Sequence, residues 1–194
     1  MKLLFLTLSL LPLVCFAQPL TDWQIVDYPG HGLVTIDDGS ITLGKGKTVT
    51  AVRWAGGELP VTDYEVTFEA MRTSGDDFFC ALTFPVDSTF ATLVLGGWHG
   101  NVSGLSCIDG VDASQNFTGS QISFRNQQWY AVRLRVTRKD VRAWLDEKPV
   151  FEVWRTDGEL SLRREMDSSK PLGFASWKSA GVIRNIILKI LSEQ

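Results

Sequence analysis

The most constraining feature of this sequence is a succession of short segments in which apolar residues fall at every second position. In TDYEVTFEAMR (62–72), apolar side chains recur from Tyr64 to Ala70, and mostly polar ones stand between them. A period of two is typical of a β-strand with one buried face. Further strand-like runs follow, each bounded by Gly, Pro, Asp or Ser: 76–84, 90–97, 104–109, 120–124, 129–137, 140–146, 147–155, 171–177 and 181–191.

Helical patterning is almost absent from the same stretch. The best candidate helix, ELSLRREMD (159–167), is short and polar. No internal repeat, low-complexity segment or linker divides the chain. Many short strands at turn-punctuated spacing indicate one all-β domain, an antiparallel two-sheet sandwich or jelly roll.

The residue pairing of one hairpin can be predicted. Arg138-Lys139 connects WYAVRLRVT (129–137) to DVRAWLD (140–146), so we expect Thr137 to pair with Asp140. One face of the hairpin is then apolar and faces the core, through the pairs Val136–Val141, Leu134–Ala143 and Val132–Leu145. The other face pairs Arg135 with Arg142 and Arg133 with Trp144. That face is either a site of cation–π contact or a solvated outer surface.

The chain begins with the pattern of a secretory signal peptide. Lys2 precedes an apolar run, and Cys15-Phe16-Ala17 supplies the small residues of a cleavage site. We expect residues 1–17 to be removed and 18–194 to form the single domain of a secreted or periplasmic protein. Acylation of Cys15 is the alternative, which the bulk of Val14 disfavours. No other long apolar run predicts a membrane span.

Charge and cysteine content exclude some classes of partner. The net charge is −3 without a basic block, which argues against nucleic acid and anionic membranes as partners. Outside the signal peptide, Cys80 and Cys107 lie in strand-like runs. They form either a disulfide or two buried thiols. Neither has a second Cys or a His at the spacing of a zinc site.

Common catalytic and metal motifs are missing. GKGKT (44–48) has Ile41 where a phosphate-binding loop needs glycine, and the chain contains no G-x-S-x-G, H-E-x-x-H or EF-hand pattern. These motifs therefore predict no cofactor. The carboxylates of Asp76-Asp77, or of Asp109 and Asp112, could hold a divalent cation such as calcium, although their spacing matches no specific loop.

Aromatic residues supply the candidate binding site. Seven tryptophans occur, and an exposed indole beside polar residues suits a sugar ring, whereas a buried one only fills a core. In GGWHGNVSG (96–104), glycines surround Trp98 and His99 and leave both rings accessible. Trp177 stands at another strand end. We expect these three to form a sugar platform, with Asp109 and Lys178 binding polar groups.

Carboxylates are candidate catalytic groups, because hydrolysis of a glycosidic bond usually needs two of them close together. Glu69 projects from the polar face of its strand, and Asp77 does so at the next strand. If these strands are adjacent, the two side chains form a catalytic acid and base. The alternative is that each is a solvated strand residue or a turn cap.

Four phrases together resemble the bacterial 3-keto-disaccharide hydrolase domain family. They are FEAMRTSGDDFFCALTFPV, LVLGGWHGNVSGLSCIDGVDASQN, QQWYAVRLRVTRKDVRAWLDEKPVFEV and KPLGFASWKSAGVIRNIILKI, and the similarity runs from about Leu59 to Ile190. The resemblance implies a concanavalin A-like jelly roll that hydrolyses the glycosidic bond of disaccharides or glycosides oxidised at C3 of the sugar.

Three hypotheses therefore stand. The first is an extracytoplasmic hydrolase of (3-keto-)glycosides, with carbohydrate as its partner. The second is a non-catalytic glycan-binding module that uses the same face, in line with the chain's two histidines and the absence of a late His phrase found in that family. The third is a cell-surface interaction domain whose aromatic residues serve a core or a protein interface.

Overall fold

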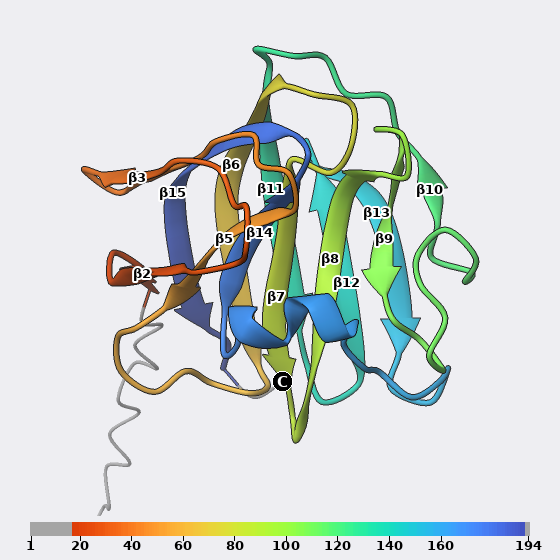
Figure 1. Ribbon diagram of the computed structural model, residues 1–194. Helices are drawn as coiled ribbons and strands as arrows, with labels where there is room; N and C mark the ends of the chain where they lie inside the picture. Colours follow the sequence, from red (N-terminus) through yellow and green to blue (C-terminus); the bar gives the residue numbers. More distant parts are fainter. Residues whose placement is uncertain (1–16, 193–194) are drawn as a thin grey trace, which may run out of the picture.

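The computed structural model describes residues 17–192 and contains two antiparallel β-sheets that face each other (Figure 1). The eight-stranded sheet has the order β13-β12-β11-β6-β15-β4-β3, and β1 also pairs with β15. Its strands are β1 (Ala17–Pro19), β3 (Val34–Asp37), β4 (Ser40–Leu43), β6 (Tyr64–Ser74), β11 (Trp129–Val136), β12 (Asp140–Leu145), β13 (Lys148–Trp154) and β15 (Ala180–Ile190).

The second sheet has seven strands in the order β10-β9-β8-β7-β14-β5-β2. They are β2 (Trp23–Val26), β5 (Val49–Trp54), β7 (Cys80–Val86), β8 (Thr89–Gly97), β9 (Val102–Ser106), β10 (Ser120–Gln121) and β14 (Gly173–Trp177). The predicted all-β, two-sheet antiparallel sandwich is confirmed.

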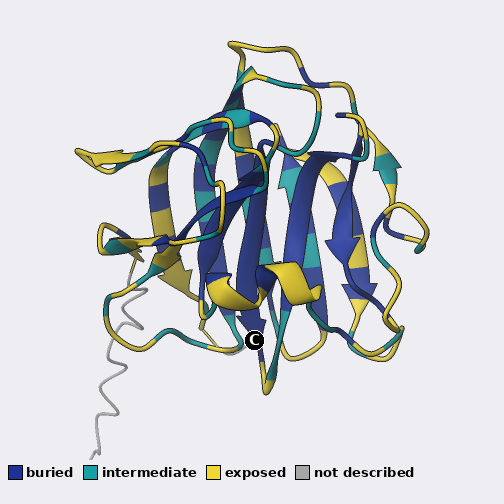
Figure 2. Cartoon of the chain, in the orientation of Figure 1, coloured by how far each residue is buried: buried dark blue, intermediate teal, exposed yellow. Residues whose placement is uncertain are grey.

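The core lies between the two sheets and follows from the alternation of each strand. Tyr64, Val66, Phe68 and Ala70 of β6 are all buried, as the period of two predicts. Across the core, Phe174 of β14 lies with its ring centroid 4.9 Å from that of Phe68. Figure 2 shows the resulting pattern, in which buried residues follow the inner strands and exposed ones the turns.

The β11–β12 hairpin has the predicted register. Val136, Leu134 and Val132 pair with the expected partners on the apolar side, and all of these residues are buried. On the outer side the Arg133 guanidinium lies 3.8 Å from the centre of the Trp144 ring, so the cation–π contact is made. Arg133 also forms ion pairs with Glu65 and Glu147, and Arg135 forms one with Glu65. Positive and negative side chains therefore alternate on this outer surface.

The segment from 159 to 167, the best helical candidate of the sequence, ends in a short 3₁₀ helix, η1 (Arg164–Ser169). It crosses the outer face of the seven-stranded sheet in front of β14, β7 and β8 (Figure 1). Met166 of η1 joins a second, smaller hydrophobic cluster on that face, made by Val26, Val49, Ala51, Ala81, Val94 and Ala175. One sheet thus buries apolar side chains on both of its faces.

Cys80 and Cys107 are both unpaired and buried. Cys80 faces the main core, where burial raises the pKa of its thiol well above the ordinary value. The Cys107 Sγ lies 3.4 Å from Ser106 Oγ. Of the two alternatives for this pair, the structure has the buried thiols.

We expect the purified domain 18–194 to expose two reactive thiols when it is unfolded in guanidinium without reductant, because free thiols, unlike a disulfide, react without prior reduction. In the native state both should react slowly with a thiol reagent. A reducing agent should leave Tm unchanged. A missing thiol signal in the unfolded, unreduced protein would contradict this arrangement.

The predicted signal peptide, residues 1–17, lies outside the described residues except for Ala17, and the alternative of an acylated Cys15 lies outside them too. Ala17 begins β1 and pairs with Lys189 of β15. Within residues 17–192, no helix has the length and apolar character needed to cross a membrane.

Candidate functional site

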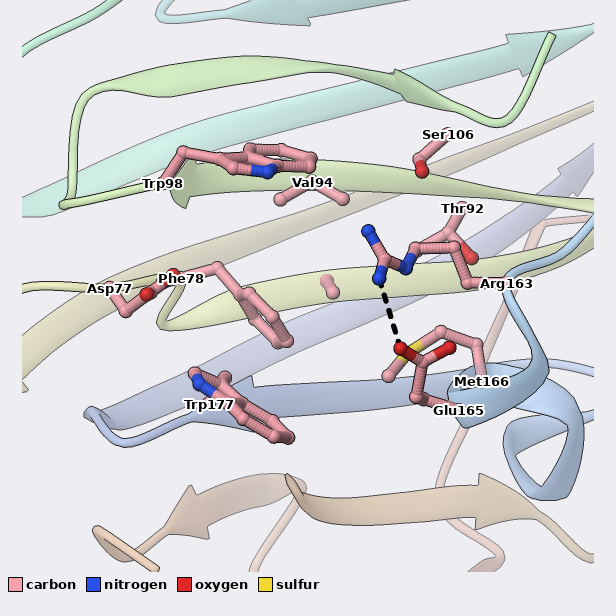
Figure 3. A pocket seen from close by; sticks show the side chains of 11 residues that line it. Asp77, Phe78, Thr92, Val94, Trp98, Ser106, Arg163, Glu165, Met166 and Trp177 are labelled. Carbon is pink, nitrogen blue, oxygen red and sulfur yellow. Dashed lines mark hydrogen bonds and ion pairs between the residues drawn. The ribbon is translucent and has the colours of Figure 1, made fainter. Parts of the chain in front are cut away.

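The outer face of the seven-stranded sheet carries a pocket of about 180 Å³ beside η1 (Figure 3). Strands β7, β8 and β14 form its floor, and the segment leading into η1 forms one wall. Its lining residues are Asp77, Phe78, Ala81, Thr92, Val94, Trp98, Ser106, Arg163, Glu165, Met166 and Trp177.

Three aromatic side chains lie at one end of this pocket because three neighbouring strands end there. Trp98 follows β8, Phe78 precedes β7 and Trp177 ends β14. Since β7 is antiparallel to both neighbours, its first residues lie beside the last residues of β8 and β14. The Trp177 N–H donates to the Phe78 carbonyl oxygen at 2.9 Å, which fixes two of the three in relation to each other.

The turn that carries Trp98 has an uncommon backbone. Trp98 and His99 have φ values of 48° and 68°, between Gly96 and Gly100. A bulky residue with positive φ is rare and carries strain that the surrounding structure must hold in place. The same turn packs tightly against its neighbour, because a Cβ at Gly100 would lie 2.8 Å from the Asp76 carbonyl oxygen. The turn that carries Trp98 is therefore in close contact with the turn that contains Asp76 and Asp77.

Two polar side chains connect the turns around the aromatic end. Ser179 Oγ accepts from the Asp77 N–H and donates to the Asp77 carbonyl oxygen, both at 2.9 Å. The buried Arg72 donates to Asn126 Oδ1 at 2.7 Å and to the Phe124 carbonyl oxygen at 2.6 Å. The two Ser179 bonds connect the Asp77 turn to the segment that follows Trp177.

An ion pair occupies the opposite end. Arg163 Nη2 donates to Glu165 Oε1 at 3.0 Å, and Arg163 Nη1 donates to Asp112 Oδ2 at 2.9 Å. The hydrogen bond from Arg163 holds the pKa of the Glu165 carboxyl below its ordinary value, and the same bond raises the pKa of Arg163. Both groups are charged at neutral pH, and each lies about half exposed at the pocket.

The floor between these ends is largely apolar. Ala81, Val94 and Met166 contribute only hydrocarbon and a thioether. Thr92 and Ser106 add two hydroxyls, of which that of Thr92 lies 3.3 Å from the hydroxyl of Thr83. The pocket thus offers stacking and apolar contact over most of its surface and charged hydrogen-bonding groups at one end.

The structure brings together three of the predicted site residues, Asp77, Trp98 and Trp177. Lys178 lies next to them, with its Nζ 5.6 Å from the centre of the Trp177 ring. His99 shares the turn of Trp98 but does not line the pocket. Asp109 also lies outside it, where its carboxylate accepts the Glu159 N–H at 2.8 Å and orders a loop.

Glu69 is not near the pocket. It projects from the outer face of the eight-stranded sheet, where its carboxylate accepts from Arg184 at 2.7 Å and from Asn185 at 2.8 Å. The expectation that Glu69 and Asp77 lie on adjacent strands is wrong, because β6 and β7 belong to different sheets. After Ser74 the chain crosses from one sheet to the other instead of turning back as a hairpin, so these carboxylates lie on different sheets.

At one of the two predicted cation positions, that of Asp109 and Asp112, the carboxylates are engaged with other partners. Asp112 accepts from Ser114 through one carboxylate oxygen and from Arg163 through the other. Asp109 is engaged with the backbone of Glu159. Among residues 17–192, no group of three or more His, Cys, Asp or Glu is placed to hold a metal ion.

Sequence reasoning missed Phe78, Arg163, Glu165 and Met166. The last three belong to the segment 159–167, which attracted attention only as a possible helix. In the sequence, this segment is marked by the charged run Arg163-Arg164-Glu165, which interrupts the strand-like pattern. Nothing in that pattern says which face of which sheet the segment covers.

No protein-family model and no curated protein matches this chain. Solved structures do. One is a Bacillus subtilis protein of unknown function with a galectin-like fold, with a TM-score of 0.61, 12% identity, and coverage of 92% of this chain and 97% of that one. Another is the carbohydrate-binding module CBM66 from Bacillus subtilis, with a TM-score of 0.57, 13% identity, and coverage of 86% and 94%.

A third is the Crh5 transglycosylase in its apo form, with a TM-score of 0.56, 8% identity, and coverage of 92% and 85%. At these identities the likeness concerns the fold. The chain has a jelly-roll fold similar to the galectin-like fold. Its membership of the 3-keto-disaccharide hydrolase family stays a prediction.

Proposed function

We propose that this protein binds carbohydrate in the pocket on the outer face of the seven-stranded sheet. The observation that carries the proposal is the combination of Trp98, Phe78 and Trp177 with the Arg163–Glu165 ion pair in one pocket. Aromatic rings take the apolar faces of sugars, and a few convergent polar groups fix the orientation of a ligand. The fold supports the same proposal, since a carbohydrate-binding module and a transglycosylase have similar structures.

Hydrolysis of 3-keto-glycosides, the activity that the family resemblance implies, is the second candidate. Glycoside hydrolysis generally needs two carboxyl groups near the bond, and Asp77 and Glu165 both line the pocket. The lowered pKa of Glu165 suits an ionised base or nucleophile and disfavours a proton donor. Asp77 would then have to be the acid. Binding without catalysis does not require a proton donor beside Glu165, and we therefore favour it.

The test measures binding and turnover side by side. The domain 18–194 is titrated with mono- and disaccharides and their glycosides, following tryptophan fluorescence and calorimetry. Release of the aglycone is then followed with 3-keto-glucosides and their unoxidised parents. We expect saturable binding without turnover.

Variants divide the two candidates. Glu165→Gln should weaken binding at least tenfold, since a hydrogen bond to a charged group contributes about 1.5–3 kcal/mol. The matched control Glu69→Gln, on the other sheet, should leave binding unchanged. Turnover that is lost in both Asp77→Asn and Glu165→Gln would establish the hydrolase instead. Absence of binding to every sugar would refute the proposal.

The signal-peptide pattern supports a secreted or periplasmic location for this activity. Glycans outside the cytoplasm would then be its ligands. Fractionation of cells that express the full chain tests this part of the proposal, with the domain expected outside the cytoplasm and without residues 1–17.

A further inference from the structure

The two ends of the pocket differ in the chemistry they can recognise. Figure 3 shows Trp98, Phe78 and Trp177 on one side and Arg163, Glu165 and Met166 on the other. A ligand that satisfies both ends must itself have two unlike parts. The nature of each part follows from the residues that would contact it.

The aromatic end is shaped for a flat apolar ring. Trp98 follows β8 and Trp177 ends β14, and these two strands flank β7 on either side. Neighbouring strands lie about 4.8 Å apart, so the two indoles are attached roughly 10 Å from each other. Aromatic pairs have centroids about 4.5–7 Å apart. Figure 3 shows the Phe78 ring between the two indoles, so a flat ring that stacks on Phe78 would lie close to both of them.

A second sugar would be poorly accommodated at that end. The floor that adjoins it includes Ala81 and Val94, which carry no hydrogen-bonding side-chain group. Of the polar side chains beside the rings, Asp77 already accepts the Phe78 N–H through Oδ1 at 2.8 Å, and Lys178 has its Nζ 5.6 Å from the centre of the Trp177 ring. A hydroxyl that is buried without a partner loses its hydrogen bonds to water. An apolar ring loses none and gains from burial.

The ionic end is suited to a sugar. The Glu165 carboxylate accepts hydrogen bonds and the Arg163 guanidinium donates them, and the two lie 3.0 Å apart. Neighbouring hydroxyls of a pyranose can engage both groups at once, one as donor and the other as acceptor. Arg163 also donates to Asp112 Oδ2 at 2.9 Å, and this second bond helps to orient the guanidinium.

We infer that the preferred ligand is a glycoside of an aromatic alcohol. Its sugar hydroxyls bind Arg163 and Glu165, and its aglycone lies between Trp98 and Trp177 over Phe78. This inference rests on the proposed function, since it names the class of carbohydrate that the pocket takes. It also orients the ligand, with the glycosidic bond above the apolar floor near Val94.

The test compares methyl and phenyl glycosides of glucose, galactose, mannose, xylose and N-acetylglucosamine, in both anomers, with phenol alone as a control. Dissociation constants are measured by calorimetry on the domain 18–194. For the sugar that binds best, we expect the phenyl glycoside to bind at least tenfold more tightly than the methyl glycoside. Phenol alone should bind at least a hundredfold more weakly than the phenyl glycoside.

Variants at each end must separate the two contributions. Trp177→Ala should reduce the advantage of phenyl over methyl to less than threefold. Glu165→Gln should weaken both glycosides by a similar factor and keep the advantage. Trp154→Ala, an exposed tryptophan on β13 of the other sheet, should change nothing.

Equal affinity for methyl and phenyl glycosides would overturn the inference and leave carbohydrate binding intact. Preference for a disaccharide over the phenyl glycoside would do the same. Binding of no glycoside at all would refute the proposed function itself. Phenol that binds as tightly as the phenyl glycoside would refute both, because the pocket would then recognise an aromatic compound without its sugar.

Discussion

Alanine at Trp98 or at Trp177 is expected to weaken binding of the preferred aromatic glycoside about 30-fold in each case, which corresponds to roughly 2 kcal/mol for a tryptophan that anchors a ligand. Both rings are half-buried at the pocket and pack on the second hydrophobic cluster. Each therefore loses ligand contact when truncated, while the strands beneath remain paired. Titration calorimetry with the best-binding phenyl glycoside measures the effect.

The backbone of Trp98 allows a sharper version of this experiment. Asparagine tolerates a positive φ better than other non-glycine residues, so Trp98→Asn should bind as weakly as Trp98→Ala and unfold at a higher temperature. The matched control is Trp154→Ala, because Trp154 is 47% exposed on β13. Full binding by Trp98→Ala together with Trp177→Ala would exclude this pocket as the site.

Alanine at Phe174 is expected to lower the free energy of unfolding by about 3–5 kcal/mol, the usual cost of removing a buried phenylalanine. Phe174 is fully buried, with its ring centroid 4.9 Å from Phe68 on the facing sheet and 5.4 Å from Trp23. It thus joins the two sheets at the centre of the sandwich. Tm should fall by roughly 10–15 °C for a domain of this size, which thermal unfolding followed by circular dichroism would detect.

Phe117→Ala is the control for that experiment. Phe117 is 62% exposed in the loop between β9 and β10, and a surface substitution of this kind usually changes stability by less than about 0.5 kcal/mol. Equal Tm values for the two variants would mean that the two sheets do not pack as described.

Much of the fold could be predicted because strand alternation is a local property. The buried face of β6 and the register of the β11–β12 hairpin both follow from residues close together in the chain. The aromatic half of the site was also within reach. Trp98 and Trp177 stand next to turn residues, and strand ends are where side chains meet a ligand.

The rest depended on pairings between distant segments. Alternation does not tell whether two consecutive strands form a hairpin or cross between sheets, so it misplaced Glu69 beside Asp77. It also says nothing of where η1 docks, which brings Arg163 and Glu165 to a pocket whose floor comes from residues 81–94. The sequence by itself determined the strands, their faces and one aromatic turn. Only the tertiary structure decided which carboxylates share a pocket with the tryptophans, because the assignment of strands to sheets arises from long-range packing.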